Sequence, residues 1–189
     1  MLHYFKKYPV KRTKLILLIA GIAVFVPVYL LNFLVMNDFM DLTTLSKLML
    51  SFDVNVFREI ILSFETRGFL NNLYVVFLLN IISVAGFCLF MFSLNLMITR
   101  RLEHHSVIHT IGLIFAPIII LIGLMDVFPS VLFLSIARNP KIISKIMVYV
   151  IDGAYVGRMV LLGLLFIWII ISGTSLLVHK LRKKNTKTE

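Results

Sequence analysis

The chain has 189 residues, of which 60% are hydrophobic, and its mean hydropathy is +0.99. Globular domains are roughly 45–50% apolar, so a water-soluble domain of this composition would lack polar surface to face water. The formal net charge is +10, but the basic residues lie in short stretches that flank apolar runs rather than in a folded basic domain. This distribution argues against nucleic-acid binding, and the composition predicts an integral membrane protein.

Residues 1–14 are predicted to be a basic cytoplasmic head, in which lysines alternate with aromatic residues as they do at a membrane interface. The first apolar run, residues 15–36, is long enough to cross about 30 Å of hydrocarbon. It is longer than the apolar core of a signal peptide and has no Ala-x-Ala cleavage site, so we interpret it as a retained span. Pro27 predicts a kink within this span.

Residues 37–68 are predicted to be an acidic external loop that covers the bundle. Apolar residues recur there with helical spacing, which predicts one or two short amphipathic helices. Asp53 is expected to be the N-cap of the second helix, which ends near Thr66 and is closed by Gly68. A structural cap is favoured over a docking or gating element.

Three further apolar runs, at 69–98, 107–136 and 142–178, complete an all-α transmembrane bundle of four spans. The third run contains Pro117 and Pro129, which predict two more kinks. A basic tail, 179–189, follows the last run and is predicted to be cytoplasmic.

Orientation follows from the lysines and arginines. The head, the turn after the second span and the tail hold five, two and five of them, against three in each of the other two loops. Basic residues favour the cytoplasmic side, so we expect a multi-pass protein of the plasma membrane with both termini in the cytoplasm.

Polar residues lie inside three of the spans. Asp126 is about ten residues from the outer end of its span, or roughly 15 Å deep, and Arg158 lies at a similar depth in the next span. An isolated charge there costs at least roughly 2.5–3.5 kcal/mol, so the two are expected to form a bidentate ion pair. Asn80 lies at a comparable depth and is predicted to join this intramembrane polar cluster.

Two interpretations of this cluster stay open. It is either an ion, proton or polar-ligand site, as intramembrane charges often are, or a structural pair that fixes the order and register of the helices. The pairing of both charges favours the structural role. Asp152 is six residues from Arg158 and is expected on another face of its helix.

Small residues predict where helices pack closely. Gly153 and Gly157 form a small-xxx-small pattern beside Arg158, and Gly123 of the third span is expected to offer the matching groove.

Enzymatic chemistry finds little support, and we predict no cofactor and no bound metal. Cys88 is the single cysteine and reads as a buried small residue. No histidine accompanies the serines inside the spans, as a nucleophile would require. His105 and His109, with Glu103 nearby, could hold a metal, but an interfacial polar role is favoured.

The arrangement resembles small uncharacterised four-span membrane proteins of bacteria and archaea. In those proteins an acidic loop follows the first span, the third span carries an aspartate and the fourth a basic residue. Asp126 in GLMDVFPS and Arg158 in VGRM hold those places here. The chain departs from that pattern after Asp126, where Val127, Phe128 and Pro129 replace a further acidic residue and an asparagine. The resemblance covers most of the chain and implies no activity.

The leading functional hypothesis is a non-enzymatic membrane protein: an accessory, partner-binding or immunity-type subunit whose partners are the lipid bilayer and a second protein or a second copy. The alternative is a small oligomeric transporter or channel-like protein that uses Asp126, Arg158 and Asn80 as its polar site. A lipid- or quinone-binding enzyme is a third reading, for which the sequence names no residues.

Overall fold

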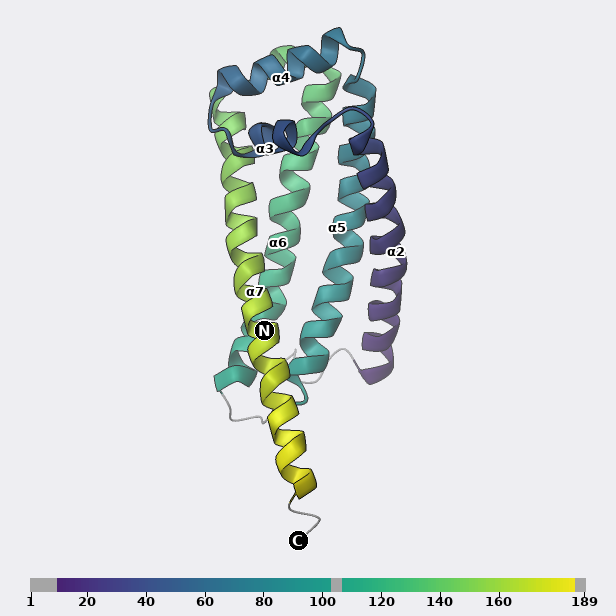
Figure 1. The fold of residues 1–189 in the computed structure, drawn as a ribbon, viewed down its shortest axis with the longest axis vertical. Coiled ribbons are helices and arrows are strands. Elements are labelled where there is room, and N and C mark those ends of the chain that lie inside the picture. Colours follow the sequence, from purple (N-terminus) through teal and green to yellow (C-terminus); the bar gives the residue numbers. More distant parts are fainter. Residues whose placement is uncertain (1–9, 103–106, 186–189) are drawn as a thin grey trace.

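The computed structural model describes residues 10–102 and 107–185. Within these ranges the chain is all-helical, with six α-helices, one short 3-10 helix and no strand. Four long helices run side by side: α2 (Lys11–Asn37), α5 (Leu70–Thr99), α6 (Val107–Arg138) and α7 (Lys145–Asn185) (Figure 1). All four are long and apolar enough to cross a membrane, which indicates a multi-pass membrane protein.

Each long helix coincides with one predicted span, but α2 begins at Lys11 rather than at residue 15, and α7 differs from its predicted span at both ends, with its end at Asn185 rather than at residue 178. Residues Pro140–Ile142 form the 3-10 helix η1, so α7 begins at Lys145 rather than near residue 142. Asn139 stabilises this turn, because its side-chain oxygen accepts a hydrogen bond from the Lys141 N–H at 3.2 Å. Pro140 at the first position supplies the fixed backbone angle that such a turn prefers.

The three prolines of the spans, Pro27, Pro117 and Pro129, lie inside continuous helices and end none of them. Residues 1–9 of the predicted head, the 103–106 turn with Glu103 and His105, and residues 186–189 lie outside the described ranges.

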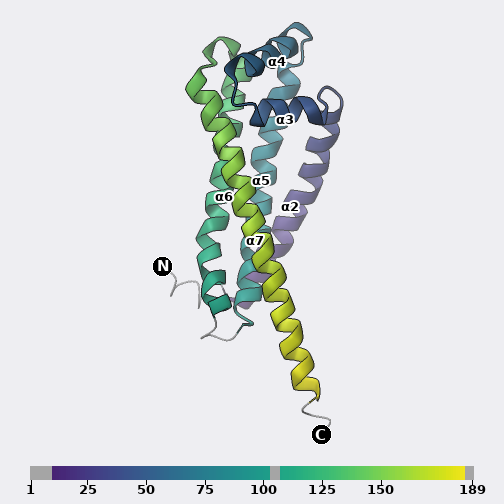
Figure 2. The same ribbon diagram turned by 60° about the vertical axis from the view of Figure 1, so that its left-hand side comes forward.

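Two short helices, α3 (Leu42–Leu50) and α4 (Val54–Thr66), lie across one end of the bundle, here named the capped end (Figures 1 and 2). Aspartates begin both helices. The Asp41 carboxylate accepts a hydrogen bond from the Thr44 N–H at 3.0 Å, and Asp53 accepts one from the Asn55 N–H at 2.8 Å. Hydrogen bonding by Thr44 also lowers the pKa of Asp41 below its ordinary value.

The end of α4 is a Schellman turn closed by Gly68, as the sequence predicts. Gly68 has a φ of +75°, which glycine adopts without steric cost. The Phe69 N–H then reaches the Phe64 carbonyl at 2.8 Å, which satisfies one of the last carbonyls of the helix.

Apolar side chains hold the cap on the bundle. Phe57 and Ile61 of α4 and Leu48 of α3 are fully buried. The Phe57 ring stacks on Phe133 of α6 with centroids 5.6 Å apart, and Phe133 in turn stacks on Phe77 of α5 at 4.0 Å. Aromatic pairs of this kind contribute about 0.5–1.5 kcal/mol beyond their buried area, so the cap is an integral part of the core.

A second apolar cluster, here named the lower core, joins α5, α6 and α7 toward the other end of the bundle. Its buried members are Met91, Leu102, Phe115, Ile119, Ile122, Leu165 and Trp168. Two hydrogen bonds tie the helices together beside it, from Asn95 Nδ2 to the Gly112 carbonyl at 2.9 Å and from Trp168 Nε1 to the Ile108 carbonyl at 3.3 Å.

Helix α2 packs chiefly against α5, through a close backbone contact that the sequence analysis did not identify. A Cβ atom added to Gly21 of α2 would lie 2.5 Å from the Phe90 nitrogen, and one added to Gly86 of α5 would lie 2.6 Å from the Phe25 nitrogen. The two glycines therefore let the helix backbones meet, as small residues do between helices in lipid.

We predict that Gly86→Ala destabilises the protein by about 1–3 kcal/mol, because the added methyl group overlaps backbone that cannot move aside. The matched control is Gly163→Ala on α7, where a Cβ meets nothing within 4 Å. The control should be neutral or stabilising, since alanine favours a helix over glycine. Thermal unfolding in mild detergent measures both. Equal stability of the two variants would contradict the close contact.

Candidate functional site

The structure brings together the three polar residues that the sequence singled out. Arg158 Nη1 of α7 lies 2.7 Å from Asp126 Oδ1 of α6, and Asn80 Nδ2 of α5 donates to the same oxygen at 3.3 Å. Asp126 is 5% exposed, so its charge is compensated by these partners rather than by solvent. The cluster joins three of the four long helices at one point.

Ser130 extends this network by one helical turn. Its hydroxyl donates to the Asp126 carbonyl at 2.8 Å and accepts a hydrogen bond from Asn80 Nδ2 at 3.0 Å. The side chain of Asn80 is thus fixed by two acceptors on α6. A serine one turn after a buried aspartate is a local signal that the sequence analysis did not use.

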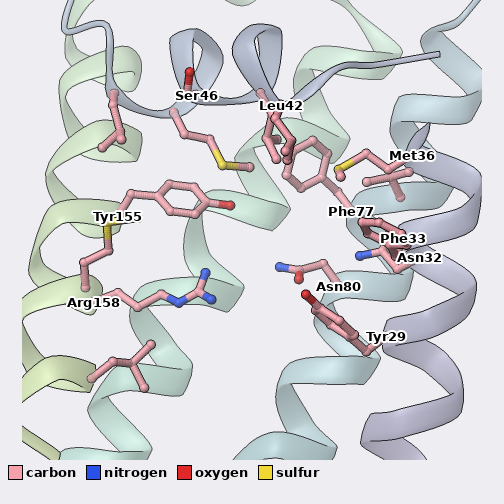
Figure 3. Close-up of a pocket in the computed structure, with 16 residues that line it drawn as sticks. Tyr29, Asn32, Phe33, Met36, Leu42, Ser46, Phe77, Asn80, Tyr155 and Arg158 are labelled. Carbon is pink, nitrogen blue, oxygen red and sulfur yellow. The ribbon is translucent and has the colours of Figure 1, made fainter. Parts of the chain in front are cut away.

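The ion pair differs from the expected bidentate form. Among the described residues Arg158 makes one hydrogen bond to Asp126, from Nη1, and the rest of the guanidinium points into a cavity (Figure 3). The reason is the cavity itself: 30% of the Arg158 side chain is exposed to it. Tyr155, one turn earlier on α7, places its ring 5.6 Å from Arg158 Cζ and supports the cation by a cation–π contact.

The cavity lies between α2 and α7, beneath α3, with α5 behind it (Figure 3). Its volume is about 470 Å³, within the roughly 300–1,000 Å³ typical of small-molecule sites. Most of its wall is apolar. The polar residues that line it are Tyr29 and Asn32 of α2, Ser46 of α3, Asn80 of α5, and Tyr155 and Arg158 of α7.

The cavity opens sideways between α2 and α7, in the stretch that is apolar enough to cross a membrane. Apolar side chains at its rim are exposed, with Phe33 of α2 43% exposed and Met159 of α7 59% exposed. In a bilayer this opening faces lipid. A molecule can therefore reach Arg158 from the membrane.

Asn32 is a cavity residue that the sequence analysis missed. Its Oδ1 atom is buried and has no hydrogen-bond partner in the described part of the chain. A buried polar atom without a partner is costly, and this oxygen is buried although other atoms of Asn32 line the cavity. In the sequence, the signal that could have identified this residue is the carboxamide side chain of an asparagine inside the otherwise apolar first span.

The glycines expected beside the cluster have different roles. Gly123 packs against Cys88 of α5, not against α7 as expected, because its face of α6 is turned toward α5. Gly157 does lie at the contact with α6, where a Cβ would be 3.1 Å from Met125 Cε. Gly153 is exposed, and a Cβ there meets nothing within 4 Å.

Asp152 fastens the cap to the bundle. It lies on a different face of α7 from Arg158, as expected, and its carboxylate accepts a hydrogen bond from the Phe52 N–H at 2.6 Å. Phe52 connects α3 to α4 with a φ of +50°, a left-handed conformation that is uncommon for residues other than glycine. The Phe52 ring also lies against Tyr149, with centroids 6.2 Å apart. The carboxylate thus holds a strained turn in place.

The polar side chains of the cavity offer hydrogen-bond donors and acceptors. Within the described ranges, no group of three His, Cys, Asp or Glu residues could hold a metal ion. Cys88 Sγ donates to the Ile119 carbonyl at 3.6 Å and does not line the cavity. Ser46, which does line it, donates to the Thr43 carbonyl at 2.8 Å.

Comparison of the chain with protein-family models, with curated proteins and with solved structures finds no match.

We predict that Asp126→Asn and Arg158→Gln each destabilise the protein by about 3–5 kcal/mol, because each leaves the other charge buried without its partner. The double variant should recover much of that loss, since it leaves no unpaired charge. Thermal unfolding of the four proteins in mild detergent gives this double-mutant cycle. Additive losses, with no recovery in the double variant, would contradict the structural pairing.

We predict that Asp152→Leu loosens the cap while the bundle stays folded. Loss of a hydrogen bond to a charged group, about 1.5–3 kcal/mol, should raise the hydrogen-exchange rate of the Phe52 amide about 10- to 100-fold. The control is Asp38→Leu, which changes an exposed carboxylate at the end of α2. An unchanged hydrogen-exchange rate of the Phe52 amide in the Asp152 variant would show that this hydrogen bond does not hold the cap on the bundle.

Proposed function

We propose that this chain is a non-enzymatic, multi-pass protein of the plasma membrane that acts by binding an amphipathic molecule from the bilayer, as an accessory subunit. The single observation that carries the proposal is the cavity, which combines a polar end at Arg158 with apolar walls and a sideways opening between α2 and α7. A lipid-like molecule has the same division into a polar head and an apolar body.

The orientation proposed from the basic residues places this cavity in the outer leaflet. Helix α2 begins and α7 ends at the end of the bundle away from the cap (Figure 2). With both termini in the cytoplasm, α3 and α4 face the outside. The cap then forms a roof over the cavity on the side where outer-leaflet head groups lie.

A transporter or channel-like function is the second candidate, because a polar cluster beside a cavity is typical of transport sites. A continuous path would have to cross the lower core, where Phe115, Ile119 and Leu165 are buried between the helices. Buried apolar side chains oppose the passage of ions and polar solutes. Binding from one leaflet needs no such path and is therefore preferred. A saturable solute flux in vesicles, lost in a folded Asp126→Asn variant, would favour transport instead.

Partial occlusion of the opening tests the binding function. We predict that wild-type protein purified in mild detergent retains about one lipid molecule per chain, detected by native mass spectrometry. Met159→Trp should lose it, because Met159 lies on the rim and tryptophan is larger. The matched control is Val160→Trp on the next residue, which is similarly exposed but does not line the cavity.

Retention in the Val160 variant and loss in the Met159 variant supports the proposal. Equal retention by the two variants, or no lipid bound to wild type above the detergent background, contradicts it.

A further inference from the structure

The cavity selects the chemistry of the head group that it encloses. We propose that it binds an uncharged lipid head that carries both hydroxyl and carbonyl oxygens, as a diacylglycerol does. This inference rests on the proposed function and adds the chemical class of the ligand.

Charge balance argues for an uncharged head. Among the described residues that line the cavity, Arg158 alone carries a charge, and that charge is already compensated by Asp126 at 2.7 Å. A phosphate or carboxylate head at Arg158 would bring a second negative charge close to Asp126, where like charges repel strongly at low dielectric. A carbonyl oxygen accepts hydrogen bonds from the guanidinium without this repulsion.

The polar groups of the wall supply both kinds of hydrogen bond. The part of the Arg158 guanidinium not bonded to Asp126 and the Tyr155 hydroxyl both point into the cavity and can donate to carbonyl oxygens (Figure 3). The Tyr29 hydroxyl of α2 also points into the cavity (Figure 3), and its oxygen can accept a hydrogen bond from a ligand hydroxyl. A head with ester carbonyls and one free hydroxyl satisfies both sides.

The position of the head group beneath α3 also favours an uncharged head. Leu42, Leu45 and Met49 of α3 line the cavity and cover it from the capped end. Moving a charged head from water into such a site costs far more than moving a hydroxyl and two esters. A volume of about 470 Å³ holds the head and the first carbons of its chains, and the remaining chain length extends between Phe33 and Met159 into the bilayer.

The test compares two lipids with identical chains, dioctanoylglycerol and dioctanoylphosphatidate. Each is titrated into the full-length, delipidated protein in mild detergent, and the midpoint of thermal unfolding reports binding, since a ligand of the folded state raises it. We expect dioctanoylglycerol to bind at least tenfold more tightly. Binding of dioctanoylphosphatidate that is equal or tighter overturns the inference and leaves the proposed function standing.

A different result would contradict the proposed function. Neither lipid then shifts the midpoint, and wild type retains no more lipid from the membrane than Met159→Trp does. That result would remove the binding site itself and not only its head-group preference.

Two variants check the contacts without disturbing the ion pair. Tyr29→Phe should weaken dioctanoylglycerol binding about three- to tenfold through the loss of one hydrogen bond, whereas Tyr149→Phe, at an exposed tyrosine of α7 that does not line the cavity, should not. Leu42→Lys adds a positive charge at the cavity wall and should shift the preference toward dioctanoylphosphatidate at least threefold at low salt. No effect of Tyr29→Phe, or no shift from Leu42→Lys, overturns the assignment.

Discussion

A carboxylate and a guanidinium buried among apolar helices constrain this bundle more than any other contact. Hydrocarbon offers neither group a partner, so α6 and α7 must face each other with Asp126 and Arg158 at the same depth. Asn80 adds α5 to the same carboxylate. One oxygen atom thereby fixes the rotation of three helices about their axes, and α2 is outside this arrangement.

The exclusion of α2 from the polar cluster explains the cavity. Helix α2 lies on α5 through the Gly21 and Gly86 contact, whereas α7 is held on α6 by the ion pair. The two outer helices are thus held by different neighbours and do not close on each other, and α3 covers the space between them (Figure 1). Asp152 and the stacked phenylalanines keep this cover in place.

Hydropathy and local spacing predicted the spans, the cap and its Asp53 and Gly68 boundaries, because these depend on neighbouring residues in the chain. The contact of Asp126 with Arg158 was predictable because consecutive antiparallel spans bring equal depths together. The rotation of each helix about its axis was not predictable. The rotation of α6 places Gly123 against α5 and not against α7. A carboxylate such as Asp152, whose partner is a backbone N–H, also leaves no mark in the sequence. The cavity exists because the first and last spans do not pack against each other. No local sequence pattern encodes the absence of such a contact.

One property of α2 has a mechanical consequence. Because it rests chiefly on α5 and forms one side of the opening, its tilt sets the width of the mouth beside Phe33. Helices tilt to match the hydrophobic thickness of the surrounding bilayer at a cost of fractions of a kcal/mol per Å. A thinner bilayer favours a larger tilt of this helix than a thicker one. If a molecule enters the cavity as proposed, its access to Arg158 depends on the thickness of the bilayer as well as on its own chemistry.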